Sequence, residues 1–185
     1  MKKRTIFIII ITLFVLASGY RFIKLNKSIS DQVEYTSVKE NQYFNINGID
    51  FKVSKSEFIN DLDDLGKQQL KVYIDLNKNG EIVQDGFDKE FPKYYHDEIL
   101  LNLTDKSGKL VDNHDSTLGF AKDNPKFVEI IKGERNIGEE KESLILRFSL
   151  DKQVMDKVKN NEYNVKVVFP RDDKGLKFNY VNISV

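Results

Sequence analysis

The segment 72–88, VYIDLNKNGEIVQDGFD, carries the most distinctive spacing of potential metal ligands in the sequence. An EF-hand-type calcium loop places oxygen ligands at positions 1, 3, 5, 7, 9 and 12, with a glycine at position 6 for the sharp turn. With Asp75 at position 1, Gly80 falls at position 6. The oxygen-bearing groups around this glycine predict a calcium site with the candidate ligands Asp75, Asn77, Asn79, Glu81 and Asp85.

The same segment also fits a plain turn between two strands. Position 12 would be a bidentate glutamate in an EF-hand and is Gly86 here, and residues 72–74 belong to a strand pattern rather than a helix. Asn79-Gly80 is a favoured pair for a type I′ turn, because both central residues need a positive φ. Both interpretations stay open: a turn without metal, or a weak calcium site of about 10⁻⁴–10⁻³ M, as in extracellular modules. No other cofactor is predicted.

The remaining candidates for chemistry are two histidines, His96 and His114. His114 stands beside Asp112 and Asp115, where it could be a metal ligand, an acid–base group or a solvated loop histidine. The aromatic segment around His96 could form a contact surface or cap the core. The chain has no G-x-S-x-G motif and no glycine-rich phosphate loop. We therefore predict no catalytic residues.

The charge balance and the lack of cysteine exclude several classes of function. The chain has 29 basic and 29 acidic residues, and residues 1–27 hold six basic residues and no acidic ones. The remainder is therefore acidic, which matches a phosphate backbone poorly, so nucleic acid is not a predicted partner. Without cysteine the chain has no disulfide, no thiolate nucleophile and no Cys-ligated zinc.

The amino terminus combines a basic start with an apolar run. Lys2, Lys3 and Arg4 precede the uncharged stretch 5–20, a pattern typical of a secretory signal or a signal anchor whose basic end is cytoplasmic. Both interpretations place the rest of the chain outside the cytoplasm. We predict a single-pass membrane protein with an external C-terminal domain, or a secreted protein if the signal is cleaved.

Short segments that alternate between apolar and polar residues predict the elements of the fold. Residues 70–76 alternate most clearly, and Asn47-Gly48 interrupts the pattern of 44–53, which predicts a tight turn or a bulge. Further strands are expected in 99–103, 144–150, 165–169 and 178–183, the last with Phe178, Tyr180 and Ile183 facing the core.

About seven strands without βαβ alternation predict an all-β, immunoglobulin-like antiparallel β-sandwich, with a small barrel as the alternative. Only 151–161 has helical spacing, with Asp151 as N-cap, and its length suits a connection between sheets. Three parts are expected: a signal anchor or signal peptide in 1–27, a polar linker in 28–42 and the β-sandwich domain in 43–185.

The order of these segments supports a resemblance. FNINGIDFKVSKSEF, QQLKVYIDLNKNG, EILLNLTDKSGKL and the pair SLILRFSL and EYNVKVVF follow one another as opening, central and late strands. This order resembles that of small immunoglobulin-like extracytoplasmic domains of Gram-positive membrane-anchored proteins and lipoproteins, over about residues 43–185. The resemblance implies the fold and no catalytic residues. Tyr20 stands where a lipoprotein would carry its lipidated cysteine.

The sequence thus predicts a non-enzymatic, membrane-tethered domain that binds an unknown protein or component of the bacterial cell envelope. Two alternatives stay open. One is a membrane-anchored accessory or immunity protein that acts through its helix on a membrane partner. The other is an envelope hydrolase that uses His114 with its neighbouring acids.

Overall fold

The computed structural model describes residues 11–24, 33–59, 66–79, 95–116, 120–135, 142–171 and 177–184. The chain divides into two compact units, residues 1–34 and 35–185. In the first unit, residues 11–24 form a helix whose large apolar side chains are exposed. Among all the residues that the structure describes, no helix is long and apolar enough to cross a membrane. The predicted apolar run 5–20 lies partly outside the described residues.

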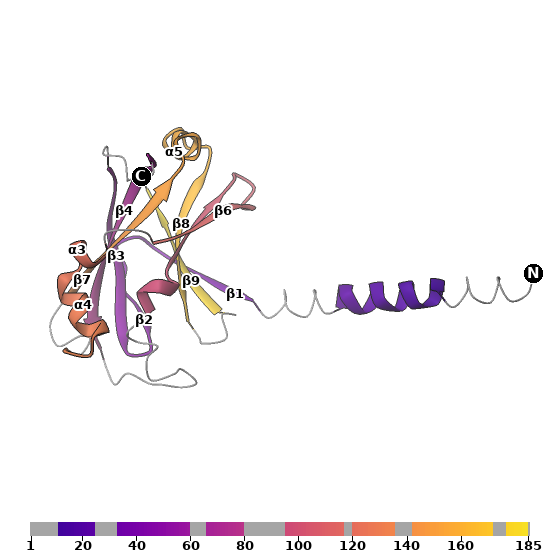
Figure 1. The fold of residues 1–185 in the computed structure, drawn as a ribbon, viewed down its shortest axis with the longest axis horizontal. Helices are drawn as coiled ribbons and strands as arrows, with labels where there is room; N and C mark the ends of the chain where they lie inside the picture. Colours follow the sequence, from indigo (N-terminus) through magenta and orange to yellow (C-terminus); the bar gives the residue numbers. More distant parts are fainter. Residues whose placement is uncertain are drawn as a thin grey trace, which may run out of the picture. The chain divides into compact units, whose positions relative to one another are not determined.

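The rest of the described chain folds into a β-sandwich (Figure 1). One sheet has the strand order β1-β9-β8-β5-β6 and the other the order β2-β3-β4-β7. The strands are β1 (Glu34–Val38), β2 (Phe44–Ile46), β3 (Ile49–Ile59), β4 (Gln68–Lys78), β5 (Leu100–Thr104), β6 (Leu110–Asp115), β7 (Glu142–Leu150), β8 (Asn164–Pro170) and β9 (Lys177–Ile183). The helical elements are η1 (Tyr95–Glu98), α3 (Phe120–Asp123), α4 (Pro125–Ile131) and α5 (Lys152–Lys159).

The core lies between the sheets and follows the predicted alternation. Leu70, Val72, Ile74 and Leu76 of β4 are at most 1% exposed. Antiparallel pairing sets Val72 opposite Leu146 of β7, which is also fully buried, so the inward face continues across the sheet. Because a slip of one residue would turn this whole set outward, burial of one face fixes the register. The other sheet faces it with a matching apolar layer: Leu101, Leu103, Val165, Val167 and Val181. The predicted alternation in 70–76, 99–103, 144–150 and 165–169 is confirmed.

The predicted turn at Asn47-Gly48 is also confirmed. Asn47 and Gly48 have φ values of 50° and 81°, and they join β2 to β3 with Ile46 opposite Ile49. Positive φ at both central residues is the requirement of a type I′ hairpin turn, which asparagine and glycine meet at low cost. The side-chain oxygen of Asn45 accepts a hydrogen bond from the Gly48 amide at 3.1 Å.

The predicted helix is α5, and it connects the two sheets as expected. It follows β7 of one sheet and precedes β8 of the other (Figure 1). Met155 and Val158 are its buried residues. Asp151 has the extended backbone of an N-cap, and its carbonyl accepts the first helical bond from Met155 at 2.9 Å. Its carboxylate makes no capping bond and lies 3.3 Å from the ammonium of Lys67 instead.

Three features differ from the predictions. The segment 28–42, predicted as a linker, contains β1, whose side chains are mostly exposed and therefore show no alternation of polarity. A second helical region, α3 and α4, begins before Pro125 and buries Phe127 and Ile130, so the prediction of a single helix in the domain is wrong. Nine strands are described rather than about seven, because short edge strands such as β1 carry little apolar signal.

In β9 the predicted phase is wrong for Phe178 and Tyr180 and right for Ile183. Asn179, Val181 and Ile183 face the core, and the two aromatic residues lie on the outer face. The Phe178 ring stacks on Tyr35 of β1 with a centroid distance of 5.2 Å. The Tyr180 ring lies beneath the Lys166 ammonium at 5.0 Å. Aromatic rings generally favour the core, but these two rings make their contacts with Tyr35 and Lys166 on the outer face instead.

Candidate functional site

The first predicted calcium ligand, Asp75, lies within β4 and already has partners. The Lys52 ammonium on the neighbouring β3 is 2.7 Å from its Oδ2, and the Ser54 hydroxyl donates to its Oδ1 at 3.2 Å. The hydrogen bond to Asp75 raises the pKa of Lys52 above its usual value. Both carboxylate oxygens of Asp75 are thus engaged by groups of the protein itself.

The next two predicted ligands lie at the end of β4. Asn77 is exposed, and the strand register sets it opposite Asp50 of β3. The side-chain amide of Asn79 donates to Asp50 at 2.7 Å, and its backbone amide donates to the Gly48 carbonyl at 2.8 Å. Asn45 donates to the other Asp50 oxygen at 2.8 Å. Asn79 therefore ties the end of β4 to the β2–β3 hairpin around Asp50, a residue that the sequence pattern did not single out.

The remaining predicted ligands, Glu81 and Asp85, lie outside the described residues. Asp75 and Asn77 belong to an extended strand, in which alternate residues are about 6.8 Å apart along the chain. Within the part of the chain that the structure describes, no group of three His, Asp or Glu side chains could hold a metal ion. The calcium site remains a prediction.

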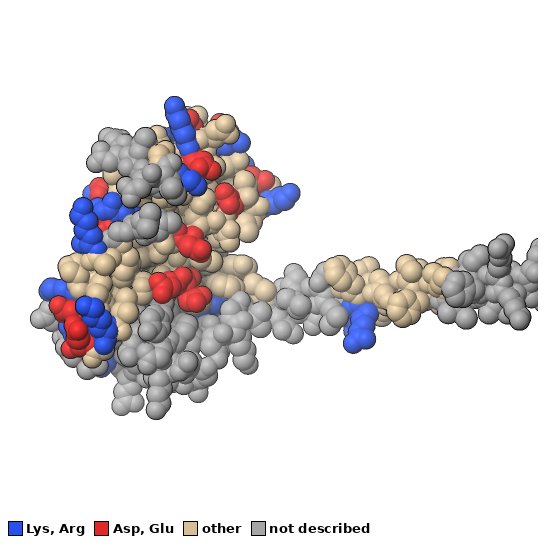
Figure 2. Space-filling model, viewed as in Figure 1, with Lys and Arg blue, Asp and Glu red and all other residues tan. Residues whose placement is uncertain are grey.

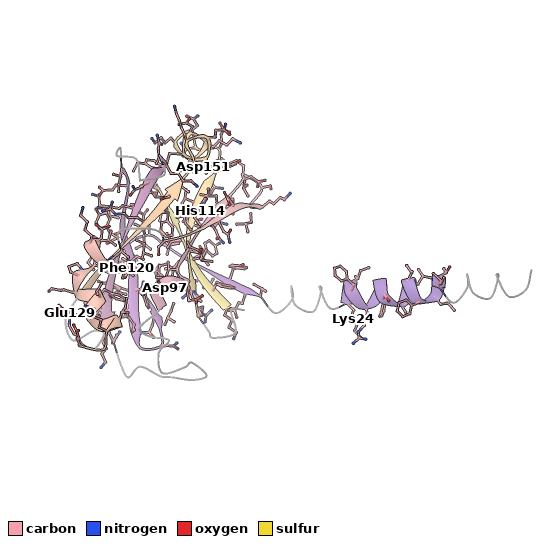
Figure 3. All side chains as sticks on the ribbon, in the orientation of Figure 1. Lys24, Asp97, His114, Phe120, Glu129 and Asp151 are labelled. Atoms are coloured by element: carbon pink, nitrogen blue, oxygen red, sulfur yellow. The ribbon has the colours of Figure 1, made fainter. Side chains whose placement is uncertain are left out.

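The two histidines lie in different environments. His96 in η1 is 4% exposed, stacks on Phe120 with a centroid distance of 4.2 Å and meets Phe127 edge-on. Figure 3 labels Phe120 on α3, beside η1. His96 therefore belongs to the aromatic end of the core. His114 lies on the β6 strand rather than in a loop, is 20% exposed, and its Nε2 is 3.3 Å from the Asp112 carboxylate (Figure 3).

The outer face of the four-stranded sheet carries a charged cluster. Arg147 of β7 contacts both carboxylate oxygens of Asp123 through Nε and Nη2 and donates to Gln69 at 3.2 Å. The hydrogen bonds from Arg147 lower the pKa of Asp123, and Asp123 raises that of Arg147. The Tyr73 hydroxyl donates to Glu57 at 2.5 Å, which raises the pKa of Tyr73 to about 12.

These charges are arranged as pairs rather than as a patch of one sign. Figure 2 shows Lys and Arg side chains interspersed with Asp and Glu on one face of the domain. Opposite charges in contact cancel each other's field at a distance, so this view gives no sign of electrostatic attraction for a polyanion.

The outer face of the five-stranded sheet is different, because amide and tyrosine side chains dominate it. Its strand pairing sets Asn113 of β6 opposite Asn102 of β5, Asn102 opposite Lys166 of β8, and Lys166 opposite Asn182 of β9. Residues directly opposite one another share a face of the sheet. Three asparagines and one lysine therefore form a row across four strands, which we call the amide row.

Two cavities adjoin here, of about 350 and about 540 Å³. The smaller lies on the outer face, and the larger extends from it past the end of the sheet to Val158 of α5 and Tyr163. Lys166 and Tyr180 line both of them. Tyr35 and Leu110 line the smaller cavity and are 57% and 52% exposed. Volumes of this size fall within the range of about 300–1,000 Å³ seen for ligand pockets. We call the two cavities together the outer-face trough.

Two polar atoms of the smaller cavity are buried without a hydrogen-bond partner among the described residues. They are Oγ1 of Thr104, a residue only 4% exposed, and Oδ1 of Asn102. No sequence motif marks this site. A signal was present, since the outward positions of these strands carry asparagine, threonine and tyrosine where a merely solvated face would favour lysine and glutamate.

Comparisons with known proteins identify no family for this chain. No protein-family model matches the chain, and no curated protein matches it. Among solved structures, the chain is similar to an uncharacterised β-sandwich protein from Clostridium difficile 630, at 14% sequence identity and a TM-score of 0.46. The similarity covers 82% of this chain and 96% of the other. The two sheets of the chain itself show that the protein is a β-sandwich.

Proposed function

We propose that this chain is a membrane-tethered, extracytoplasmic binding protein that contacts a component of the cell envelope through the outer-face trough. The observation that carries the proposal is the pair of adjoining cavities on an outer sheet face, bordered by the exposed side chains of Tyr35 and Leu110. Concave sites with a few convergent polar groups are the usual places of ligand binding.

The strand order supports an immunoglobulin-like sandwich. In that fold one sheet has the order A-B-E-D and the other contains G, F and C, to which C′ can be added. Taking β3, β4 and β7 as A, B and E makes β9, β8, β5 and β6 correspond to G, F, C and C′. The helices α3 and α4 connect β6 to β7, where strand D would run.

The amino-terminal sequence supports the tether. Lys2, Lys3 and Arg4 precede an uncharged apolar stretch, and the positive-inside rule then favours a domain outside the cytoplasm. In this proposal the membrane is one partner, through the N-terminal helix, and the envelope component is the other.

The carboxyl groups with lowered pKa values are structural partners rather than candidates for a general acid. The pKa values of Glu57, Asp105 and Asp123 are lowered by hydrogen bonds from Lys55, Ser107 and Arg147 respectively. A carboxyl group that acts as a general acid near neutral pH needs a raised pKa. These three groups are held ionised instead, which suits structural pairing.

Site-specific photo-crosslinking of the full-length chain in cells tests the proposal. A photoreactive residue in place of Tyr35 reports on the trough, and one in place of Tyr43, which is 41% exposed and contacts Lys52 of the other sheet, is the matched control. We expect an envelope component to crosslink at position 35 and not at position 43. Equal crosslinking at both positions, or none at position 35, contradicts the proposal.

A further inference from the structure

The amide row has the chemistry of a hydrogen-bonding site rather than of a solvated surface. At a strand spacing of about 4.8 Å, its four side chains span about 14 Å across the sheet. Each asparagine offers a carbonyl oxygen that accepts and an NH₂ group that donates two hydrogen bonds. Such a row can pair with a ligand that presents donors and acceptors alternately along its length.

Thr104 and Asn102 give an independent reason to expect a ligand. Thr104 is 4% exposed and lines the smaller cavity, and its Oγ1 has no hydrogen-bond partner in the described part of the chain. The same holds for Oδ1 of Asn102. Leaving buried polar atoms unpaired costs free energy, so native structures rarely keep them without a reason. Hydroxyl and amide groups of a ligand are of the kind that pair with such atoms.

The charge of the trough restricts the ligand further. Among the described residues that line the two cavities, none is Asp or Glu, and Lys166 is the single charged side chain. A polycation would find no carboxylate among these lining residues. Two further lysines contact residues that line the larger cavity: Lys106 lies 3.3 Å from Asn164 Oδ1 and Lys157 lies 3.1 Å from the Tyr163 hydroxyl. The site therefore suits a ligand that carries no positive charge.

Tyrosine rings supply the apolar contacts of the trough. Tyr35 lines the smaller cavity, Tyr180 lines both, and Tyr163 lines the larger one. Tyrosine combines a flat apolar ring with a hydroxyl group, which suits a ligand that is apolar on its faces and polar at its edges. A sugar ring has this character, and an acetamido substituent adds an amide that both donates and accepts, as the asparagines of the amide row do.

We propose that the outer-face trough binds an oligosaccharide that carries acetamido groups, such as a glycan of the cell envelope. This proposal rests on the proposed function, which places the trough outside the cytoplasm, where such a glycan lies. Its test uses purified components, so glycan binding and envelope contact can fail separately.

The experiment measures binding of the N-acetylglucosamine hexamer to the full-length chain by isothermal titration calorimetry. The protein is solubilised in a detergent without a sugar headgroup, because a glycosidic detergent would compete. We expect saturable binding, with affinity about tenfold weaker for Tyr180→Ala, because the variant loses the ring shared by the two cavities. Maltohexaose, which has no acetamido group, should bind more weakly than the hexamer.

The matched control is Tyr43→Ala. It also removes a tyrosine ring beneath a lysine, the ammonium of Lys52 lying 4.8 Å from the Tyr43 ring, but on the other sheet. This variant should bind as the wild type does. Asn182→Ala, at an exposed position, should weaken binding without a change in melting temperature and covers the case that Tyr180→Ala does not fold.

Several outcomes overturn the proposal. One is the absence of binding at millimolar hexamer, and another is equal binding of maltohexaose. Equal loss of affinity in Tyr43→Ala would show that the effect of Tyr180 is not local. If an envelope protein crosslinks at position 35 and no glycan binds, the trough still contacts the envelope as proposed. Its ligand is then a polypeptide and not an oligosaccharide.

Discussion

At the scale of single residues, Asp123 and Arg147 show how a charge pair is held on the outer face of the four-stranded sheet. The Asp123 side chain is 10% exposed, and Arg147 Nη2 donates to its Oδ1 at 2.6 Å while Nε donates to Oδ2. A two-point contact of this kind fixes both planar groups. The pairing lowers the pKa of Asp123, so the folded state favours the ionised carboxylate.

We therefore expect Asp123→Asn to lower the free energy of unfolding by about 2 kcal/mol at pH 7, the usual value of a hydrogen bond to a charged group. Because the pKa of Asp123 in the folded state lies below its ordinary value of 3.8, this stabilisation is present above pH 3.8 and is lost as the pH falls through the folded pKa. Urea unfolding at neutral and acidic pH measures the effect. The difference between wild type and variant should shrink in acid, whereas Asp156→Asn, an exposed position on α5, should show no difference at either pH.

Asp75 is the residue at which the calcium prediction can be decided. Its carboxylate is paired with Lys52, so a calcium ion would have to displace the ammonium group. If the loop binds calcium, a concentration of about ten times Kd adds about 1.4 kcal/mol to the free energy of unfolding and raises Tm by a few degrees. Asp75→Ala should abolish this rise, and Lys52→Met should increase it by removing the competing charge. An unchanged Tm in calcium and in EDTA would leave Lys52 and Ser54 as the partners of Asp75 and contradict the calcium site.

At the scale of elements, the β7 edge of the four-stranded sheet is covered by the segment that contains α3 and α4. Asn124, between the two helices, accepts a hydrogen bond from the Ile145 amide at 2.6 Å and donates to the Ile145 carbonyl at 2.8 Å. Its side-chain amide thus takes the place of a further strand at this residue. Covering an edge in this way blocks pairing with other chains.

This arrangement predicts the effect of Asn124→Ala. Asn124 is 3% exposed, so its loss leaves two part-buried backbone groups of Ile145 unpaired and should lower the free energy of unfolding by about 1–3 kcal/mol. Hydrogen exchange should also become faster at the Ile145 amide. Asn113→Ala, at an exposed position on β6, is the matched control and should change neither quantity. An unaltered exchange rate at Ile145 would show that Asn124 does not protect this edge.

The elements differ in how far the sequence predicts them. Strands with one buried face, such as β4 and β7, are predictable because burial of alternate residues leaves a period of two in the sequence. β1 has no such period, because nearly all of its side chains are exposed. Phe178 and Tyr180 misled the prediction because their partners, Tyr35 and Lys166, come from distant parts of the chain. The amide row escaped prediction for the same reason, since strand pairing rather than sequence spacing brings its asparagines together.

At the scale of the whole molecule, two parts of the chain have distinct roles in the proposed function. The first 27 residues carry basic and apolar side chains, and the remainder is acidic overall. In the proposal, the first part places the protein in the envelope and the outer-face trough selects what it contacts. A tethered site does not need high affinity, because confinement to the envelope raises the effective concentration of its ligand.

The orientation of the chain is the last prediction. Alkaline phosphatase is active only outside the cytoplasm, so a fusion after Val185 should be active in cells that express the full-length protein. Replacement of Lys2, Lys3 and Arg4 by Glu should reduce this activity, because Arg21 and Lys24 then become the nearest basic residues and favour the opposite orientation. Replacement of three basic residues within 152–159 by Glu is the control and should leave the activity unchanged, since charges far from the apolar stretch contribute little to orientation. Activity is normalised to the amount of fusion protein in the membrane fraction. An inactive fusion of the native sequence would place the domain in the cytoplasm and remove the basis for contact with an external envelope component.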